Sequence, residues 1–312
     1  MRQRVKLNFC DFWPHFDRHD NFFTRLLRER FEVEIVDDPD FLIYSCFGKQ
    51  HRSFRGIRIY YCGENRRPDF CSCDYAFAFD YLDRVEHCRL PFYVIRTPVD
   101  LLLQPEEPAE QILASKTSFC NFVFSNAHCR RRNEFFRKLS RYKRVDSGGR
   151  HWNNVGGPVA DKLQFQRRYK FSIAFENSSY PGYTTEKLPD AVAAGTLPIY
   201  WGNPLVAREF NPKRFLNYSD YGNDEALIEK IIELDHDEAQ YLEYLDQPLF
   251  YDNQPNPYFD PQRLLQQFQR IFSTGRRPVA RSLPKYFFFQ SKRLGRNFQR
   301  LASLPEKLLR SA

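Results

Sequence analysis

Residues 169–203 of the chain read YKFSIAFENSSYPGYTTEKLPDAVAAGTLPIYWGN, and this stretch decides the fold. Its first seven residues are rich in aromatic and β-branched side chains, which predicts a strand over 169–175. A polar loop and a short helix follow, and Gly195 ends the helix. A second strand is predicted over 197–201. Together these segments form a β-loop-α-β unit, which is typical of α/β folds with parallel strands.

The loop before the predicted helix carries turn and capping residues. Pro181 and Gly182 turn the chain tightly, and Thr184 or Thr185 can cap the helix. In α/β folds the loop after the carboxyl end of a strand binds phosphorylated ligands through polar side chains and backbone N–H groups. An ordinary βαβ unit with a solvated first helical turn is the alternative. Four polar side chains are expected in this small region: Asn177, Tyr183, Glu186 and Lys187.

Three segments of this stretch match the signature of a known family. They are FEN at 175–177, YTTEK at 183–187 and AGTLPIYWG at 194–202. In this order and spacing they resemble the donor-binding signature of the α1,3-fucosyltransferases. That family transfers L-fucose from GDP-fucose to glycans that contain N-acetylglucosamine. A match of this length and order is not expected by chance.

The resemblance extends over about residues 1–250. FSN at 124–126, RNEF at 132–135 and VDSGG at 145–149 are similar to the segment that opens the donor domain of bacterial members. Upstream, YCGEN at 61–65 is similar to part of their N-terminal domain. The chain therefore resembles a bacterial-type α1,3/4-fucosyltransferase over most of its length.

The first part of the chain alternates between strand-like and helix-like segments. Aromatic and β-branched runs predict strands over 5–9, 32–36, 41–46 and 57–62, and an amphipathic pattern predicts a helix over 22–30. The resemblance implies the GT-B arrangement, in which two Rossmann-like domains face each other across a cleft. The predicted fold class is therefore α/β, of the GT-B type.

Three parts of the chain are expected. They are an N-terminal acceptor-binding Rossmann-like domain over 1–115, a GDP-fucose-binding Rossmann-like domain over 116–275, and a basic amphipathic tail over 276–312. The donor-binding domain is expected to begin with a strand over 121–125 and to contain a late helix over 224–234.

The formal net charge of +8 is concentrated in the tail. Ten of the 47 Lys and Arg residues and a single acid lie from Arg276 onward, which leaves the preceding body with a net charge of −1. A nucleic-acid-binding body is therefore not supported.

The tail has a helical pattern of apolar and basic positions, which suits a helix lying on anionic lipid. A helix packed on the body and a disordered basic tail are the alternatives.

The start of the chain lacks the apolar segment of a signal peptide, and no run of about 18 apolar residues could span a membrane. We therefore expect a cytoplasmic protein, in contact with the inner face of the bacterial cytoplasmic membrane if its tail binds lipid.

All eight Cys lie between Cys10 and Cys129, and reduced thiols in the core are expected there. A zinc site within 62–88 is the alternative, but the spacing lacks the paired CxxC of zinc ribbons.

Transfer from GDP-β-L-fucose to an α-linkage inverts C1 of fucose. It needs a base for the acceptor hydroxyl, positive charge at the departing diphosphate, and a donor held in line. With the resemblance counted, we expect Arg132 and Lys187 at the diphosphate, because a guanidinium fork and a compact ammonium both suit phosphate oxygens. Arg131 is the nearest rival of Arg132. No Asp-x-Asp motif is placed to bridge a metal, so no cofactor is expected and a divalent metal is at most stimulatory.

The resemblance also implies that Asn177, Tyr183 and Glu186 contact GDP-fucose. Glu186 can accept hydrogen bonds from sugar hydroxyls, and Tyr183 can donate one to a phosphate. Ser125 and Asn126, near a strand end, are candidates for the nucleotide. The sequence does not say which donor atom each of these residues touches.

Glu64 is the candidate general base. It follows the predicted strand over 57–62 and a glycine, so its carboxylate should emerge at the carboxyl edge of the sheet, and its position resembles that of the proposed base in bacterial members. Asp80, Asp83 and Glu86 compete for this role.

The expected reaction transfers fucose to the 3-OH of N-acetylglucosamine in N-acetyllactosamine-type glycans, giving a Lewis-antigen-like product. The 4-OH stays open, because the match is loosest in the N-terminal domain. One alternative is a GT-B transferase that uses another nucleotide sugar. Another is a catalytically inactive, membrane-associated glycan-binding protein. Aromatics such as Trp13 and Phe16 could help to choose the acceptor.

Overall fold

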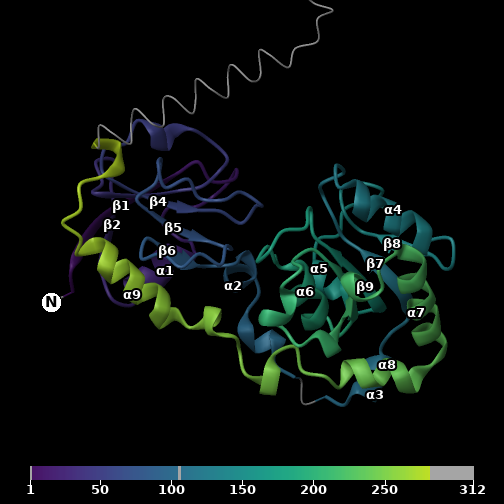
Figure 1. Ribbon diagram of the computed structural model, residues 1–312. Helices are drawn as coiled ribbons and strands as arrows, with labels where there is room; N and C mark the ends of the chain where they lie inside the picture. The colour runs from purple at the N-terminus through teal and green to yellow at the C-terminus, as the bar shows by residue number, and fades with distance from the viewer. Residues whose placement is uncertain (1, 105–106, 282–312) are drawn as a thin grey trace, which may run out of the picture. The chain divides into compact units, whose positions relative to one another are not determined.

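The computed structural model describes residues 2–104 and 107–281. The chain divides into two compact units (Figure 1). The described residues of Met1–Ala78, Leu82–Cys88 and Pro261–Ala312 form the first unit, and Phe79–Tyr81 and Arg89–Asp260 form the second. Apart from 276–281, the predicted tail lies outside the described residues.

The first unit is built on a six-stranded sheet with the order β2-β1-β3-β4-β5-β6. Its strands are β1 (Arg4–Cys10), β2 (Glu32–Ile35), β3 (Phe41–Tyr44), β4 (Ile57–Tyr61), β5 (Tyr75–Ala78) and β6 (His87–Arg89). The pairs from β2 through to β5 are parallel. Their carboxyl ends therefore meet at one edge of the sheet, where the loops after β1, β3 and β4 begin.

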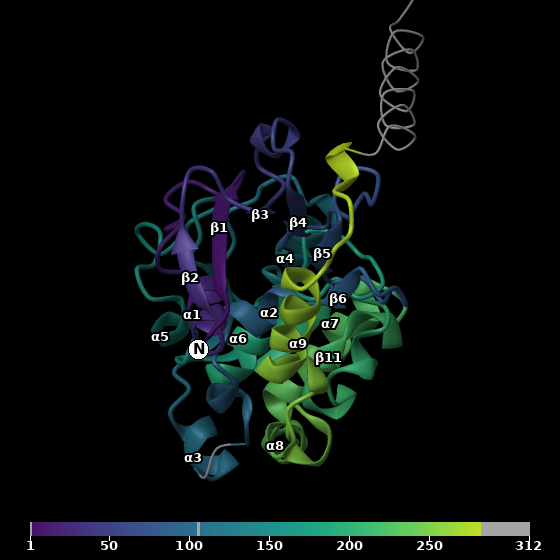
Figure 2. The ribbon, with the colours of Figure 1, turned by 90° about the vertical axis from the view of Figure 1, so that its left-hand side faces the viewer.

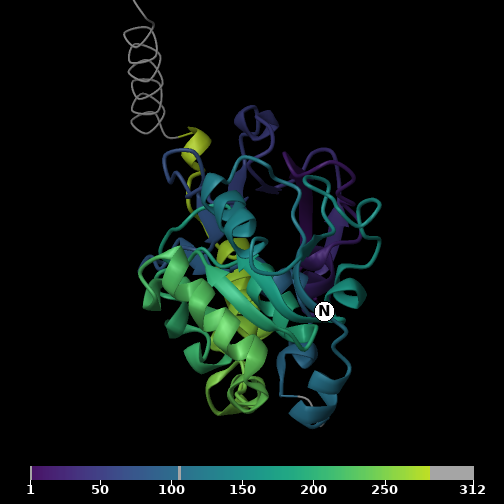
Figure 3. The same ribbon diagram turned by 90° about the vertical axis from the view of Figure 1, so that its right-hand side faces the viewer.

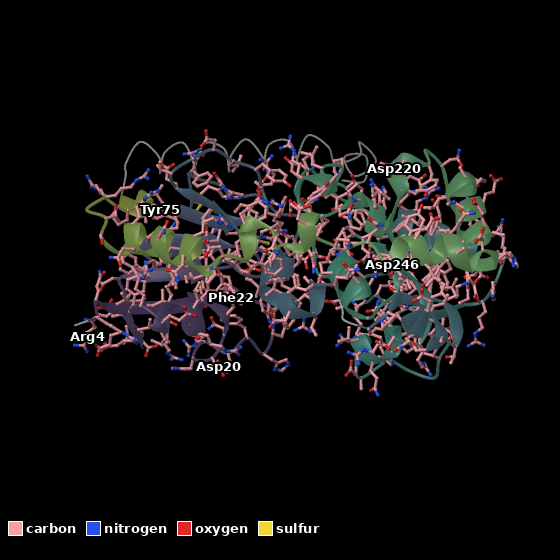
Figure 4. All side chains as sticks on the ribbon, turned by 90° about the horizontal axis from the view of Figure 1, so that it is seen from below. Arg4, Asp20, Phe22, Tyr75, Asp220 and Asp246 are labelled. Carbon is pink, nitrogen blue, oxygen red and sulfur yellow. The ribbon has the colours of Figure 1, made fainter. Side chains whose placement is uncertain are left out.

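Two helices cover one face of this sheet: α1 (Phe22–Arg28) and α9 (Pro261–Phe272). They lie side by side in Figures 1 and 2, and Phe268 of α9 stacks on Phe77 of β5 at 4.5 Å between ring centroids. Phe23 of α1 packs edge-on against Phe268 at 6.2 Å. Tyr75, labelled in Figure 4, donates a hydrogen bond of 3.2 Å to Thr274 Oγ1, just after α9. The last part of the described chain thus completes the core of the first unit.

The second unit is built on a five-stranded parallel sheet with the order β11-β10-β9-β7-β8. Its strands are β7 (Ser118–Phe122), β8 (Val145–Ser147), β9 (Tyr169–Phe175), β10 (Leu197–Trp201) and β11 (Leu216–Asn217). Its helices are α2 (Phe92–Arg96), α3 (Ala109–Ala114), α4 (Arg130–Leu139), α5 (Lys162–Gln166), α6 (Lys187–Ala193), α7 (Asp224–His236) and α8 (Glu238–Leu245). Figure 3 looks onto this unit, with the green helices α7 and α8 beside the teal strands.

The alternation of side chains along β9 divides the core of the second unit into two layers. Phe171, Ile173 and Phe175 pack in one cluster with residues of α4, α7 and α8. Ala174 packs in the other cluster, with Leu188 and residues near α6. Figure 1 shows α4 and α7 on one side of the strands and α5 and α6 on the other. The sheet is therefore covered on both faces, as parallel sheets require.

Short 3-10 helices connect these elements. They are η1 (Gln50–Arg52) and η8 (Val279–Arg281) in the first unit, and η2 (Val99–Leu102), η3 (Val206–Arg208), η4 (Pro212–Arg214), η5 (Tyr218–Asp220), η6 (Tyr251–Asn253) and η7 (Pro257–Phe259) in the second. In the part of the chain that the structure describes, no helix combines the length and apolar character needed to cross a bilayer.

The two strands predicted over 169–175 and 197–201 are found with those bounds, as β9 and β10. Gly195 follows the end of α6 with a φ of +64°, as a helix-terminating glycine should. The strand predicted over 121–125 was placed too late, since β7 spans Ser118–Phe122. Residues 118–120 are buried or half-buried in the sheet, and the chain turns after Phe122 toward α4.

The predicted cap of α6 was wrong. Glu186 is the N-cap residue, and no side chain caps the helix. Thr185 instead donates its hydroxyl to Glu176 Oε2 at 2.7 Å, and Thr184 Oγ1 accepts from Asn203 Nδ2 at 3.1 Å. Both hydroxyls face buried polar partners, which compete with capping.

The two units do not follow the predicted boundaries at 115 and 275. The chain leaves the first unit after Cys88 and returns to it at Pro261, so α9 belongs with the first sheet. The apolar face of α9 includes Leu264, Phe268 and Phe272, all buried, and Phe31 and Phe41 contact Phe272 edge-on. An amphipathic pattern shows that a helix covers a sheet, but not which of two sheets it covers.

Candidate active site

The candidate donor residues lie where β7 and β9 end. These strands are parallel neighbours in the sheet, so their carboxyl ends share one edge. The loop after β7 leads to α4, and the loop after β9 leads to α6. Polar side chains from both loops and from the first turns of both helices therefore come together there.

Arg132 joins the two loops. Its side chain lies in the first turn of α4 and is 1% exposed. Nη2 donates to the backbone carbonyl of Asn126 at 2.6 Å, and Nη1 donates to Oδ1 of Asn177 at 2.9 Å. The guanidinium lies 5.0 Å from the ring centroid of Phe124. Burial lowers the pKa of Arg132 from its usual value, although nearby groups such as Glu176 favour the charged form.

One donor of Arg132 has no hydrogen-bond partner among the described residues. This is Nε–H, which is buried. A buried unpaired N–H costs free energy that a ligand oxygen could recover. Arg132 thus combines a fixed position with one buried N–H that is unpaired in the described chain.

The two arginines that precede Arg132 point elsewhere. Arg130 is exposed and pairs with Glu134 at 2.6 Å within α4. Arg131 forms an ion pair with Asp224 of α7, and its guanidinium lies 4.2 Å from the ring centroid of Tyr218. Of the three, Arg132 is the one that reaches the loop after β9.

Glu176 organises the start of α6 and was missed as a site residue. It directly follows β9 and its side chain is fully buried. Its carboxylate accepts from Thr185 N and Thr185 Oγ1, each at 2.7 Å, and from Lys187 Nζ at 3.1 Å. Burial raises the pKa of Glu176, against the charge of Lys187. The signal in the sequence was a carboxylate at a strand end next to Asn177, within the FEN segment.

Lys187 lies between two carboxylates. Its Nζ is 3.1 Å from Glu176 and 3.7 Å from Glu186, and it donates to Thr185 Oγ1 at 2.8 Å. Burial disfavours the ammonium, but the charges of Glu176 and Glu186 outweigh it and raise the pKa of Lys187. Lys187 is therefore a fixed positive charge.

Glu186 is held in its ionised form. Burial opposes ionisation, but the positive charges of Lys187 and Lys162 lower the pKa of Glu186 to about 2. Its side chain keeps 21% of its surface exposed. A partly accessible, permanently ionised carboxylate can accept hydrogen bonds from hydroxyl groups of a ligand.

Tyr183 lies in the same loop as these groups. It is 1% exposed, its N–H donates to the carbonyl of Tyr180 at 3.0 Å, and its ring packs edge-on against Phe79 at 5.2 Å. Asn203 fastens this loop to the end of β10, since its Oδ1 accepts from Gly182 N at 2.7 Å. Asn203 was missed as a positioning residue, although it ends the quoted stretch.

Two glycines allow the close packing around this loop. A Cβ on Gly202 would lie 2.4 Å from Cγ of Glu176. Gly182 has a φ of +86°, and a Cβ there would lie 2.6 Å from the carbonyl oxygen of Phe79. Both positions therefore require glycine.

The two weaker nucleotide candidates lie on the loop after β7. Ser125 is exposed and Asn126 is half-buried. The Asn126 carbonyl accepts from Arg132, and its Oδ1 accepts from His128 N at 2.9 Å. The Asn126 side chain shapes the loop, whereas Ser125 faces solvent. The structure thus brings Arg132, Asn126, Asn177, Glu186 and Lys187 into one hydrogen-bonded and charged neighbourhood, with Tyr183 in its loop.

Glu64 lies in the first unit, on the exposed loop after β4. The sulfur of Cys62 contacts its backbone: Glu64 N donates to Sγ at 3.3 Å, and the thiol donates to the Glu64 carbonyl at 3.4 Å. Among its rivals, Glu86 pairs with Arg276 at 3.0 Å and Asp80 is buried. Asp83 is exposed.

Across residues 2–104 and 107–281, no three His, Cys, Asp or Glu side chains gather closely enough to hold a metal ion. The zinc alternative within 62–88 therefore finds no cluster in the described chain.

Two family models match the chain. Residues 7–96 match the N-terminal domain of α-(1,3)-fucosyltransferase FucT, and residues 113–256 match the C-terminal part of glycosyltransferase family 10, the fucosyltransferases. The two matches together cover most of the chain and include Glu64 in the first and every candidate donor residue in the second.

Curated relatives agree with these models. The chain is 33% identical over 259 residues to the α-(1,3)-fucosyltransferase FucT of Helicobacter pylori. This match covers 70% of this chain and 54% of that protein. It is 34% identical over 146 residues to the bovine 3-galactosyl-N-acetylglucosaminide 4-α-L-fucosyltransferase FUT3. This match covers 45% of this chain and 40% of that protein. The chain thus spans about half the length of the curated relatives it matches.

A solved structure matches most of the chain. The crystal structure of an α1,3-fucosyltransferase with GDP-fucose has a TM-score of 0.74 to this chain, with 27% sequence identity over 88% of this chain and 92% of that one. The two parallel sheets and this match confirm the predicted α/β fold of the GT-B class. The chain belongs to glycosyltransferase family 10, the fucosyltransferases.

Proposed function

We propose that this chain transfers L-fucose from GDP-β-L-fucose to the 3-OH of N-acetylglucosamine in N-acetyllactosamine-type glycans, with inversion at C1. The observation that carries the proposal is the neighbourhood of Arg132, Asn177, Glu186 and Lys187 at the shared edge of β7 and β9. The α1,3-fucosyltransferase with the matching fold was crystallised with GDP-fucose, which supports the same donor here. The second unit is the donor-binding part in this proposal, and the first unit binds the acceptor.

Arg132 and Lys187 bind the diphosphate. Arg132 has a buried, unpaired Nε–H in the described chain, and Lys187 is fixed by Glu176 and Thr185. Negative charge grows on the diphosphate as the bond from C1 to the phosphate oxygen breaks, so both cations stabilise the transition state more than the ground state. Because these cations meet the leaving group, a divalent metal is dispensable or only stimulatory.

Glu186 accepts hydrogen bonds from hydroxyl groups of the donor, Asn177 donates hydrogen bonds to them through Nδ2, and Tyr183 contacts the donor from the same loop. The ionised form of Glu186 is the one suited to accepting such bonds, and its pKa of about 2 keeps it ionised at neutral pH. Ser125 and Asn126, on the loop after β7, contact the nucleotide.

Glu64 takes the proton of the acceptor hydroxyl. The hydroxyl oxygen then attacks C1 of fucose, the bond from C1 to the β-phosphate oxygen breaks, and GDP leaves. Glu64 suits this role because its loop follows the carboxyl end of β4 and its side chain is exposed. General-base help of this kind contributes about 10²–10⁴-fold to the rate.

Exposed aromatic side chains at the same edge of the first sheet bind the acceptor sugar. Trp13 and Phe47 are 37% and 50% exposed, and their rings pack edge-on at 6.4 Å between centroids. Phe16 packs against Trp13 at 5.3 Å. These residues follow β1 and β3; β3 adjoins β4, the strand before Glu64, and β1 adjoins β3. An aromatic ring with one free side offers a flat apolar surface for a sugar ring.

The decisive experiment is mass spectrometry of N-acetyllactosamine incubated with the full chain and GDP-fucose in the presence of EDTA. A gain of one deoxyhexose supports donor, acceptor class and metal independence together. Linkage analysis of the product then decides between the 3-OH and the 4-OH. Absence of product in EDTA and in manganese, together with absence of GDP binding by calorimetry, would refute the proposal.

Variants of two acidic residues test the base. Glu64→Gln should lower kcat by about 10²–10⁴-fold while GDP affinity stays unchanged. Asp83→Asn is the matched control, because Asp83 is an exposed carboxylate of the same unit, and its kcat should stay within about twofold of the wild type. Near-normal turnover of a folded Glu64→Gln protein would remove Glu64 from the mechanism.

A transferase that uses another nucleotide sugar is the second candidate. Inhibition by GDP but not by UDP supports the fucose donor. Inhibition by UDP alone favours the rival.

A further inference from the structure

A cavity lies at the amino edge of the second sheet. Its volume is about 610 Å³, within the range of about 300–1,000 Å³ that is typical of small-molecule sites. Its lining includes Lys116, Arg167, Gly195 and Arg214, each of which stands two residues before a strand of this sheet. The candidate donor residues lie at the opposite, carboxyl edge of the same parallel strands. With its 7 residues, β9 puts about 20 Å between the two edges.

Arg214 is a buried cation without an acidic partner. It is 5% exposed, and among the described residues its hydrogen bond runs from Nη1 to the carbonyl of Thr196 at 3.1 Å. Burial lowers the pKa of Arg214 to about 10, and no carboxylate in the described chain offsets that effect. A buried charge without a counter-charge costs free energy, which an anion in the cavity would offset.

Lys116 is held by neutral groups beside this arginine. Its Nζ donates to the carbonyl of Arg167 at 2.8 Å and to the carbonyl of Ala194 at 3.1 Å. These residues end α5 and α6, so their carbonyls suit a cation, but they leave its full charge in place. A Cβ on Gly195 would lie 3.3 Å from Nζ, so the glycine leaves room for the ammonium.

The cations of the cavity repel one another. Burial, followed by the charges of Arg214 and Arg167, lowers the pKa of Lys116 to about 8, while Glu107 acts in the opposite direction. Glu107 and Asp100 are the acids of the lining, and both are exposed. An anion placed among the three cations would relieve this repulsion.

Apolar side chains form much of the remaining lining. Leu102, Ile112 and Leu249 are buried and border the cavity. A ligand that fits this lining therefore carries an anionic group and an apolar part. Phosphate suits the three cations better than carboxylate does, because it offers three acceptor oxygens instead of two.

We propose that this cavity binds a small organic phosphate, such as an alkyl phosphate. The phosphate group contacts the side chains of Lys116, Arg167 and Arg214, and the apolar body packs on the leucine and isoleucine side chains. The guanidinium groups donate to two oxygens each and the ammonium donates as a compact charge. This site shares no residue with the proposed transferase site, so it can exist whether or not the chain transfers fucose.

Calorimetric titration of the full chain with octyl phosphate tests the site. We expect saturable binding of one molecule, with inorganic phosphate, 1-octanol and octanoate each at least about tenfold weaker. Absence of octyl phosphate binding up to about 1 mM would overturn the proposal. Equal affinity for 1-octanol would overturn the anion site, and equal affinity for octanoate would overturn the choice of phosphate.

Variants assign the bound probe to this cavity. Lys116→Gln and Arg167→Gln should each weaken octyl phosphate binding about tenfold, the size of a lost charge-assisted hydrogen bond. Lys213→Gln is the matched control, because Lys213 is an exposed neighbour of Arg214 in η4, and it should bind as the wild type does. Arg132→Lys should also bind as the wild type does. Displacement of the probe by GDP, or a loss confined to Arg132→Lys, would place the probe at the carboxyl edge and overturn the proposal.

Chemical labelling of the wild type gives a second measurement, which does not depend on any variant folding. Octyl phosphate should slow acetylation of Lys116 by an N-hydroxysuccinimide ester and leave labelling of Lys213 unchanged, as mass spectrometry of the digested peptides reports. Lys116 that stays unprotected at saturating probe would overturn the proposal.

The affinity for octyl phosphate should also depend on pH. Because Lys116 loses its charge through a pKa of about 8 in the free protein, the affinity should fall about tenfold from about pH 7 to about pH 9. The same titrations of Lys116→Gln should show no such fall. An equal fall in both proteins would remove Lys116 from the site.

Discussion

At the residue scale, three successive arginines show that the direction in which a side chain points decides which residues it can bind. Arg130, Arg131 and Arg132 have the same chemistry, but only Arg132 has a side chain that is almost fully buried between the two loops. The sequence alone could not single out Arg132 among the three arginines, because they occupy adjacent positions in the first turn of one helix. The family resemblance was needed to choose it. The structure supplies a physical reason: the guanidinium bridges Asn126 and Asn177.

Replacement of Arg132 tests this bridging. Arg132→Lys keeps a positive charge but loses the fork that bonds both loops. We expect kcat/KM for GDP-fucose to fall by about 10²-fold or more, the size typical of a lost group that stabilises transition-state charge. Arg130→Ala is the control, because Arg130 is exposed and pairs only with Glu134 among the described contacts. Equal loss in both variants in steady-state kinetics would contradict the assignment.

The ionised state of Glu186 contributes stability that depends on pH. Its folded pKa is lowered from 4.5 to about 2, so this stability is fully present above pH 4.5 and is lost as the pH falls toward 2. The free energy of unfolding of wild type should exceed that of Glu186→Gln by about 2–3 kcal/mol at neutral pH. The difference should shrink in the window between those two pKa values.

Urea titrations at several pH values measure this difference. Glu229→Gln, on the exposed side of α7, serves as the control and should match the wild type throughout. A Glu186→Gln difference that stays constant down to about pH 2 would show that the carboxylate is not ionised by its lysine neighbours.

At the element scale, hydrophobic pattern predicted β9 and β10 with correct bounds but placed β7 too late, and it did not predict the polar surroundings of these strands. The aromatic runs of β9 and β10 gave correct bounds because each strand is buried on both faces. Glu176 was missed because a glutamate after a strand looks like a solvated loop residue. Its burial depends on Thr185 and Lys187, which return to it nine and eleven residues later. The loop thus folds back onto the end of the strand that precedes it. Contacts of this kind depend on three-dimensional packing, and the hydrophobic periodicity of the sequence does not predict them.

Helix α9 was not predicted from the sequence, and its residues were included in the donor-binding domain, whereas it packs on the first sheet. Its buried Phe268 stacks on Phe77 and contacts Phe23, both far away in sequence. Phe268→Ala should lower the free energy of unfolding of the first unit by about 3–5 kcal/mol, as for other buried phenylalanines. Gln266→Ala, on the exposed side of the same helix, should cost less than about 0.5 kcal/mol.

Thermal or urea unfolding distinguishes these two variants. If Phe268→Ala and Gln266→Ala unfold at the same midpoint, α9 does not support the first sheet.

At the scale of the whole molecule, charge is divided unequally along the chain. Seven Lys or Arg residues and one acid lie in 282–312, outside the described residues. The membrane contact inferred from that segment stays a prediction. A chain that ends at residue 281 should no longer sediment with vesicles containing anionic lipid, whereas the full chain should do so at low salt. Equal sedimentation of both chains, or of neither, would contradict it.

The return of α9 to the first sheet has a consequence for synthesis on the ribosome. Residues 89–260 are interposed between two parts of the first unit, so the interposed unit can emerge and fold before its host is complete. The aromatic core around Phe77 must wait for α9, the last α-helix of the described chain. The first 88 residues alone therefore expose apolar surface while the chain grows, and a gene fragment that stops before α9 should yield aggregated protein rather than an isolated first unit.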